Sequence, residues 1–250
     1  MNILFKNISV ISPSDNLKGN FDLAIRNGII ENLGVPGNNS VTEYDEIING
    51  ENLTVVPGFY DMHVHFRDPG QTEKEDIESG VNSAANGGFT GVLCMPNTKP
   101  PIDSREIITY ILEKARGMIV DVNVSACASK NREGIELSDL NELHNAGALA
   151  FTDDGSPLLD RNVLSETFKY SAEHSIPFLQ HAENYKLSGK GVVHKGKVSE
   201  ELKVEGIPYE SETMTVKNDI ELADSIRGTK YHVQHISCGE TVDLIRKARI

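Results

Sequence analysis

From Pro57 onward, short apolar runs alternate with helical patterns, and this alternation recurs about six times along the chain. The clearest apolar runs after the first one are residues 89–95, 119–124, 148–152 and 177–180. Strands that alternate with helices form parallel sheets, because each helix returns the chain to the start of the next strand. We therefore predict an α/β fold for residues 57–250.

The loop after the first of these strands distinguishes between two common α/β folds. A doubly wound fold would place a glycine-rich phosphate loop here. The sequence instead has His65-Phe66-Arg67-Asp68-Pro69-Gly70, so a (β/α)8 TIM-type barrel fits better. Since about six of the eight βα units can be identified, we expect the barrel to be incomplete. The chain would then be an N-terminal fragment or a truncated product that ends after the sixth strand and helix.

Residues 1–56 have a different pattern and predict a small N-terminal β-sandwich lobe. Asn27-Gly28 and Asn49-Gly50 each separate two strand-like runs. Both dipeptides are typical of two-residue hairpin turns. We therefore expect a hairpin at each position, and a lobe that ends before the barrel begins at residue 57.

Three capping boxes predict where helices of the barrel begin. They are Thr72-x-x-Glu75, Asp103-x-x-Glu106 and Ser237-x-x-Glu240. The segment from Asn184 to about Tyr209 is rich in Gly and Lys and longer than a typical connection. We predict that this segment is a mobile active-site loop.

Composition excludes several classes of function. The chain has 24 Lys+Arg and 37 Asp+Glu, and the net charge of −13 opposes non-specific binding to nucleic acid or to an anionic membrane. No apolar run approaches the roughly 20 residues of a membrane span, and the first residues do not resemble a signal peptide. A cytoplasmic protein is expected. The three cysteines, Cys94, Cys127 and Cys238, lie far apart and predict buried thiols rather than disulfides.

Candidate metal ligands lie at the ends of four predicted strands. His63 and His65 end the first strand, and side chains two apart on a strand point to the same face. The later strands lead to Asp153-Asp154, His181 and His235. The C-terminal ends of parallel strands meet on one rim of a barrel, so these side chains can surround a metal ion. An isolated His-x-His pair is as often structural, and the metal hypothesis depends on all four strands.

With these residues in place, the sequence resembles the amidohydrolase superfamily and, within it, the bacterial class I dihydroorotases. The resemblance covers almost the whole chain, and its most specific segments are residues 57–70, 87–90, 95–98, 151–155, 181–183 and 235–237. It implies a zinc-dependent cyclic amide hydrolase. Such an enzyme interconverts N-carbamoyl-L-aspartate and (S)-dihydroorotate in de novo pyrimidine biosynthesis.

The resemblance also implies roles for the metal ligands. One or two zinc ions are expected, with His63 and His65 at one position and His181 and His235 at the other. His232 lies three residues before His235, so only one of the two can face the barrel interior, and His235 is favoured. Asp154 resembles the family's bridging carboxylate. In the alternative, Asp153 is the ligand and Asp154 caps the following turn.

The substrate carboxylate is expected to bind Arg67 and Asn97, next to His65. A guanidinium can hold a carboxylate through two charge-assisted hydrogen bonds. In the alternative, Arg67 forms a surface ion pair with Asp68 or Asp61 and Asn97 is a turn residue. The family's general acid/base is a carboxylate that would lie beyond Ile250, so we expect residues 1–250 alone to be inactive.

Other members of the superfamily give alternative functions. Allantoinases and dihydropyrimidinases share the His-x-His strand, but they place a carboxylated lysine at the end of strand four, where this chain has Asp153-Asp154. A truncated, inactive homologue could instead act as a scaffold. The expected partners are a small-molecule substrate, a second copy in a homodimer, and aspartate transcarbamoylase; no nucleic acid or membrane partner is expected.

Overall fold

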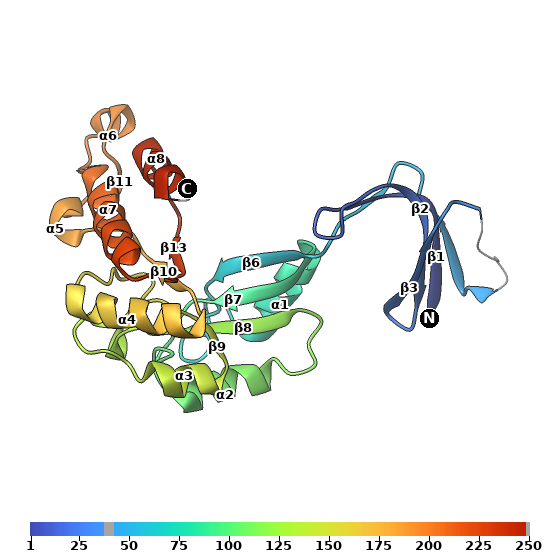
Figure 1. The fold of residues 1–250 in the computed structure, drawn as a ribbon, viewed down its shortest axis with the longest axis horizontal. Helices are drawn as coiled ribbons and strands as arrows, with labels where there is room; N and C mark the ends of the chain where they lie inside the picture. Colours follow the sequence, from blue (N-terminus) through green and yellow to red (C-terminus); the bar gives the residue numbers. More distant parts are fainter. Residues whose placement is uncertain (38–42, 249–250) are drawn as a thin grey trace. The chain divides into compact units, whose positions relative to one another are not determined.

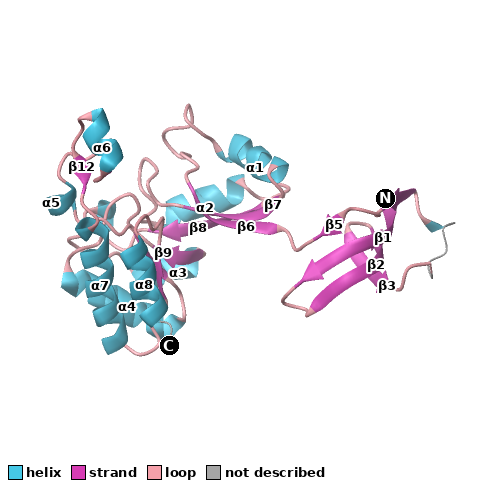
Figure 2. Cartoon of the chain, turned by 90° about the horizontal axis from the view of Figure 1, so that it is seen from above, coloured by secondary structure: helices cyan, strands magenta, loops and turns pink. Residues whose placement is uncertain are grey.

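The computed structural model describes residues 1–37 and 43–248. The chain divides into two units, Met1–Phe59 and Tyr60–Ile250 (Figures 1 and 2). Our sequence-based boundary, between residues 56 and 57, lies just before this division. No helix in the described ranges is long and apolar enough to cross a membrane.

The described part of the first unit forms one sheet with a small apolar core around Ile8, Val10 and Leu23. The strand order is β3-β2-β1-β4, and β5 also pairs with β1. The predicted hairpin at Asn27-Gly28 is confirmed, because Arg26 pairs with Ile29 in an antiparallel ladder. Both turn residues have positive φ, at 52° and 79°, as this turn requires. The strands are β1 (Asn2–Ser12), β2 (Leu17–Arg26), β3 (Ile29–Gly34), β4 (Glu46–Asn49) and β5 (Thr54–Val55).

The second predicted hairpin, at Asn49-Gly50, is wrong. Strands β4 and β5 both pair with β1 in parallel, so the chain does not reverse direction between them. Gly50 N donates to Lys6 O at 2.7 Å, and a Cβ added at Gly50 would lie 2.6 Å from the Cβ of Ile8. The glycine is therefore required by a close approach to β1 rather than by a hairpin turn.

The second unit contains a sheet of six strands in the order β13-β10-β9-β8-β7-β6. Neighbouring strands from β7 to β13 pair in parallel. The spatial order follows the chain order, as in a TIM barrel, whereas a doubly wound sheet reverses its order at one point. The prediction of an incomplete (β/α)8 barrel is confirmed. The strands are β6 (Phe59–Val64), β7 (Phe89–Cys94), β8 (Asp121–Ala126), β9 (Ala148–Phe151), β10 (Phe178–Gln180) and β13 (Tyr231–Val233).

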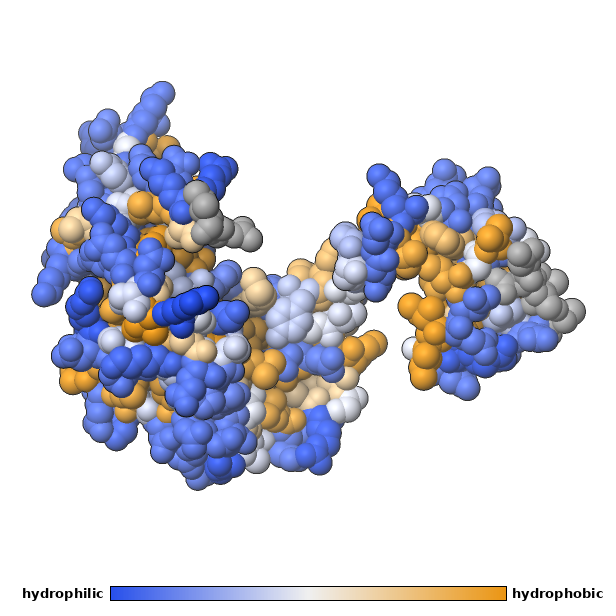
Figure 3. All heavy atoms as spheres, viewed as in Figure 1, coloured by the Kyte–Doolittle hydropathy of each residue, from blue (hydrophilic) through white to orange (hydrophobic). Residues whose placement is uncertain are grey.

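Helices pack on the outer face of this sheet and bury the main core (Figure 1). Residues alternate along each strand, so Val92 and Cys94 join that core while Leu93 and Met95 form a smaller cluster with Ala150 and Leu179. Polar side chains cover the outer surface over α3 and α4 (Figure 3). The helices are α1 (Ile77–Asn86), α2 (Arg105–Lys114), α3 (Leu140–Ala146), α4 (Arg161–His174), α7 (Glu210–Ser225) and α8 (Gly239–Ala248).

The three predicted capping boxes are wrong in position. Helix α1 is capped by Asp76, whose side chain accepts a hydrogen bond from Ser79 N, and α2 begins after Ser104. The side chain of Asp103 instead accepts from Asn131 N at 2.9 Å, and Ser237 Oγ donates to Glu212 at 2.6 Å. Asp103 and Ser237 therefore bond to distant segments rather than capping the helices next to them.

The segment between Asn184 and Tyr209, which we predict to be a mobile active-site loop, contains regular structure. This insertion contains α5 (Tyr185–Ser188), β11 (Val193–His194), α6 (Lys197–Leu202) and β12 (Gly206–Ile207). Strands β11 and β12 pair in parallel. The hydroxyl of Tyr185 donates to Gly155 O at 2.8 Å, so the insertion contacts the loop that follows β9.

Candidate metal centre

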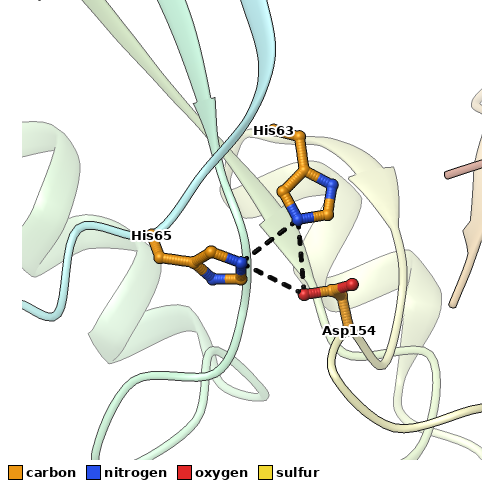
Figure 4. A group of neighbouring side chains, drawn as sticks. All are labelled: His63, His65 and Asp154. Carbon is orange, nitrogen blue, oxygen red and sulfur yellow. Dashed lines mark hydrogen bonds and ion pairs between the residues drawn. The ribbon is translucent and has the colours of Figure 1, made fainter. Parts of the chain in front are cut away.

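His63 and His65 lie at the end of β6 and converge on Asp154, which follows β9 (Figure 4). Their Nε2 atoms are 3.2 Å apart. Each Nε2 lies 3.5 Å from Oδ2 of Asp154. The two-residue spacing on a strand therefore brings both imidazoles to one carboxylate oxygen.

His181 and His235 approach the same carboxylate from two other strands. His181 follows β10 and His235 follows β13. His181 Nδ1 and His235 Nε2 are 3.0 Å apart, and each lies 3.3 Å from Oδ1 of Asp154. Asp154 thus offers one oxygen to each pair of histidines, which is the arrangement of a bridging ligand.

The two groups fit metal ions by their chemistry. In each group, two imidazole nitrogens and one carboxylate oxygen lie within 4.8 Å of one another. These are zinc ligands, and three protein ligands leave an open position in a tetrahedral site. His181 Nδ1 and His235 Nε2 lie 3.0 Å apart and face the same carboxylate. A cation bound by both nitrogens would stabilise this arrangement.

Electrostatics favour the protonation states that a metal needs at Asp154 and His65, whereas His235 would have to lose a proton when metal binds. Burial raises the pKa of Asp154, but hydrogen bonds with His181, His235 and His63 outweigh it and lower this pKa far below its usual range. Burial lowers the pKa of His65, while the hydrogen bond to Asp154 raises the pKa of His235. An ionised carboxylate and neutral imidazoles are the forms that bind metal.

The backbone at His235 is held in an unusual conformation. Its φ is +33°, in the left-handed region that residues with a Cβ seldom adopt. Behind it, Glu212 on α7 accepts hydrogen bonds from Ser237 N at 2.9 Å and from Cys238 N at 3.3 Å. These bonds tie the loop after β13 to α7 and stabilise the strained residue.

Asp153 and His232 lie away from this group. Asp153 is 1% exposed, and its carboxylate accepts hydrogen bonds from the backbone and hydroxyl of Ser129. His232 lines a different cavity of about 780 Å³ with Tyr231 and Ile236. The structure therefore brings Asp154 and His235 to the other histidines, and it gives Asp153 a loop-holding role.

Arg67 and Asn97 lie beside the histidines in a cavity of about 330 Å³. Asn97 Oδ1 lies 2.9 Å from His65 Nδ1, and Arg67 donates to Asn97 O at 3.2 Å. Asp68, a suggested ion-pair partner of Arg67, is buried and bonded instead to Lys114 at 2.6 Å. The cavity is lined by His63, His65, Arg67, Asn97, Asp154, Gly155, His181 and His235.

The polar partners of the histidines were not predicted from the sequence. Gln234 is 3% exposed, and its amide lies 3.0 Å from His63 Nδ1. Thr152 Oγ1 donates to Gln234 Oε1 at 3.4 Å and accepts from Asp154 N at 3.1 Å. Glu183 lies 3.2 Å from His181 Nε2. Their only signal in the sequence is that each lies within two residues of a candidate ligand.

Comparison with solved structures identifies the fold. L-Hydantoinase (dihydropyrimidinase) from Arthrobacter aurescens superposes with a TM-score of 0.79 at 21% identity, over 99% of this chain and 55% of that chain. A D-hydantoinase superposes with a TM-score of 0.76 at 24% identity, over 100% of this chain and 55% of that chain. At this identity the likeness shows a shared fold and no more.

Comparison with protein sequences identifies the family. A family model described as dihydro-orotase-like matches residues 53–241. The dihydroorotase of Aquifex aeolicus (strain VF5) is 40% identical over 98% of this chain and 57% of that protein. The dihydroorotase of Clostridioides difficile (strain 630) is 42% identical over 99% of this chain and 58% of that protein. This chain therefore belongs to the dihydro-orotase-like family, and it spans somewhat more than half the length of these relatives.

Proposed function

We propose that this chain supplies the metal centre of a zinc-dependent dihydroorotase. The reaction would be the reversible interconversion of N-carbamoyl-L-aspartate and (S)-dihydroorotate. The observation that carries the proposal is Asp154, which presents a different carboxylate oxygen to each of two histidine pairs. The relatives named dihydroorotase, at about 40% identity, support the choice of substrate.

The chain's own residues would hold zinc at two positions. His63 and His65 would bind at the first and His181 and His235 at the second, with Asp154 shared between them. When bound, zinc would polarise the amide carbonyl and make water nucleophilic near neutral pH. The low pKa of Asp154 keeps its carboxylate charged, so the shared ligand is available throughout the working pH range.

Arg67, Asn97 and His65 would orient the substrate. The guanidinium of Arg67 lines the cavity beside the histidines and can take the substrate carboxylate by two hydrogen bonds. The Oδ1 of Asn97 faces His65 Nδ1, so its Nδ2 remains to donate to the same carboxylate. This arrangement would hold the amide carbon towards Asp154 and the histidines.

Zinc content and substrate choice test this proposal. In a protein extended by the remaining barrel strands, replacing His63 and His65 with Ala should remove zinc from the first position and abolish hydrolysis of dihydroorotate. Elemental analysis and the hydrolysis rate are the measurements. Full zinc in that double variant would overturn the ligand assignment.

A second comparison separates dihydroorotase from a dihydropyrimidinase-type enzyme. A dihydroorotase should prefer dihydroorotate strongly over dihydrouracil, which has no carboxylate for Arg67 to bind. Equal turnover of the two substrates would favour the dihydropyrimidinase-type alternative. The cytoplasmic location, the homodimer and the association with aspartate transcarbamoylase stay predictions.

A further inference from the structure

His181 is oriented differently from the other three candidate ligands. His63, His65 and His235 turn Nε2 towards Asp154, whereas His181 turns Nδ1 towards it. The Nε2 of His181 points the other way and lies 3.2 Å from Oε2 of Glu183.

The local backbone brings Glu183 to this ring. Glu183 follows His181 by two residues, and Glu183 N donates to His181 O at 2.9 Å. This tight turn returns the glutamate side chain to the outer edge of the imidazole. The side chain of His181 is only 17% exposed, so an Nε2–H that points outward needs an acceptor within the protein.

A carboxylate at this point fixes the tautomer of the ring. An ionised carboxylate only accepts hydrogen bonds, so its partner nitrogen must carry the proton. With the proton on Nε2, the lone pair of His181 lies on Nδ1, which faces Asp154 and His235. Outer carboxylates of this kind orient metal-binding histidines in many proteins.

We propose that Glu183 is a positioning residue that holds His181 in the Nε2–H tautomer, with Nδ1 presented to the second metal position. The inference rests on the metal centre proposed above. The histidines of the first position have neutral partners, since Gln234 faces His63 and Asn97 faces His65. Zinc binding at the second position therefore depends on the carboxylate of Glu183, whereas the outer partners at the first position are neutral amides.

Three variants of the full chain test this role. Glu183→Ala removes the acceptor, Glu183→Gln keeps a neutral oxygen that can accept from Nε2–H, and Glu201→Ala is the control. Glu201 lies on α6 of the neighbouring insertion, and its side chain is 63% exposed and faces Lys197. Zinc affinity is measured by competition with a coloured chelator. Long-range ¹H–¹⁵N spectra of the histidine rings, with and without zinc, report the tautomer of His181.

Glu183→Ala should weaken zinc binding at one of the two positions by about 10- to 100-fold and should change the ring resonances of His181. Glu183→Gln should lie between Glu183→Ala and the unmodified protein, and Glu201→Ala should match the unmodified protein. Unchanged affinity and an unchanged His181 spectrum in Glu183→Ala would overturn the inference. If the unmodified protein binds no zinc, the proposed metal centre fails. The spectra of the zinc-free proteins then decide whether Glu183 positions the ring.

Discussion

The two halves of the candidate centre are built differently, although Asp154 serves both. The first half, His63 and His65, comes from a single strand, and amide side chains face the outer nitrogens. The second half, His181 and His235, comes from strands that lie far apart in the sequence, and the carboxylate of Glu183 faces the outer nitrogen of His181. The first half is therefore set by local strand geometry, while the second depends on the assembled sheet and on the carboxylate of Glu183.

The largest effect should come from the residue that the two halves share. Asp154→Asn removes the charge from both groups at once, so we expect zinc to be lost from both positions. A change at either histidine pair should remove zinc from one position only. Elemental analysis of purified protein measures the difference.

Asp153→Asn is the matched control, because Asp153 bonds to Ser129 and not to a histidine. It should keep its zinc. If Asp153→Asn lost both ions while Asp154→Asn kept them, Asp153 would be the ligand and the bridging assignment would be wrong.

The next effect concerns the first half, where Arg67 lies beside His65. Arg67→Lys keeps the positive charge but loses the planar pair of donors. In a protein extended by the remaining barrel strands, we expect kcat/KM for dihydroorotate to fall by about 10- to 1,000-fold, which corresponds to roughly 1.5–4 kcal/mol. Zinc content should not change, because Arg67 contacts Asn97 rather than Asp154. A fall in zinc content equal to the fall in rate would show that Arg67 acts on the metal instead.

The first half of the centre could be predicted from the sequence because its geometry is local. A period of two places His63 and His65 on one face of any strand, whatever the rest of the fold does. The convergence of strand ends on one rim also predicted which segments would bring the other candidate side chains to this group. The order of the six strands then followed from the βα alternation.

The parts that failed depend on contacts between distant segments. Gln234 contacts His63 across 171 positions of the chain, and no local pattern indicates such a contact. The turn at Gly50 depends on how closely the backbone approaches β1, and a hairpin dipeptide carries no information about that distance. Asp103 bonds to Asn131 and Ser237 bonds to Glu212 on α7, so their capping patterns were misleading.

A smaller effect is expected from Gln234, the amide partner of the first half. Its amide contacts His63 and is linked through Thr152 to the backbone of Asp154. Gln234→Leu keeps most of the volume but removes these bonds, so zinc affinity at the first position should fall by about 10- to 100-fold. Affinity at the second position should change less.

Gln234→Leu and Glu183→Ala are controls for each other, because the first should weaken zinc binding at the first position and the second should weaken it at the second position. Metal titration of each variant, with the thermal midpoint as a check on folding, measures the effect. If both variants weakened the same position, the separation of the centre into two independently supported halves would be wrong.

The smallest effect on the centre should come from Asp219, which lies behind the second half. Its carboxylate is 4% exposed and accepts hydrogen bonds from Gln180 at 2.9 Å and from Tyr231 at 2.8 Å. Burial raises the pKa of Asp219 from 3.8 to about 6. Both partners lie in the strands that precede His181 and His235, so this network supports the second half without touching a ligand.

The raised pKa of Asp219 predicts a pH-dependent stability. Between about pH 4 and 6 the unfolded chain ionises at this residue before the folded chain does, so the folded state binds more protons. The free energy of unfolding should therefore fall as pH rises through this window, by up to about 3 kcal/mol from this group. Asp219→Asn cannot ionise and should not show this contribution. The measurement is the difference in unfolding free energy between the two proteins at pH 4 and pH 7. If the difference in unfolding free energy between the two proteins did not change with pH, the pKa of Asp219 would not be raised in the folded state.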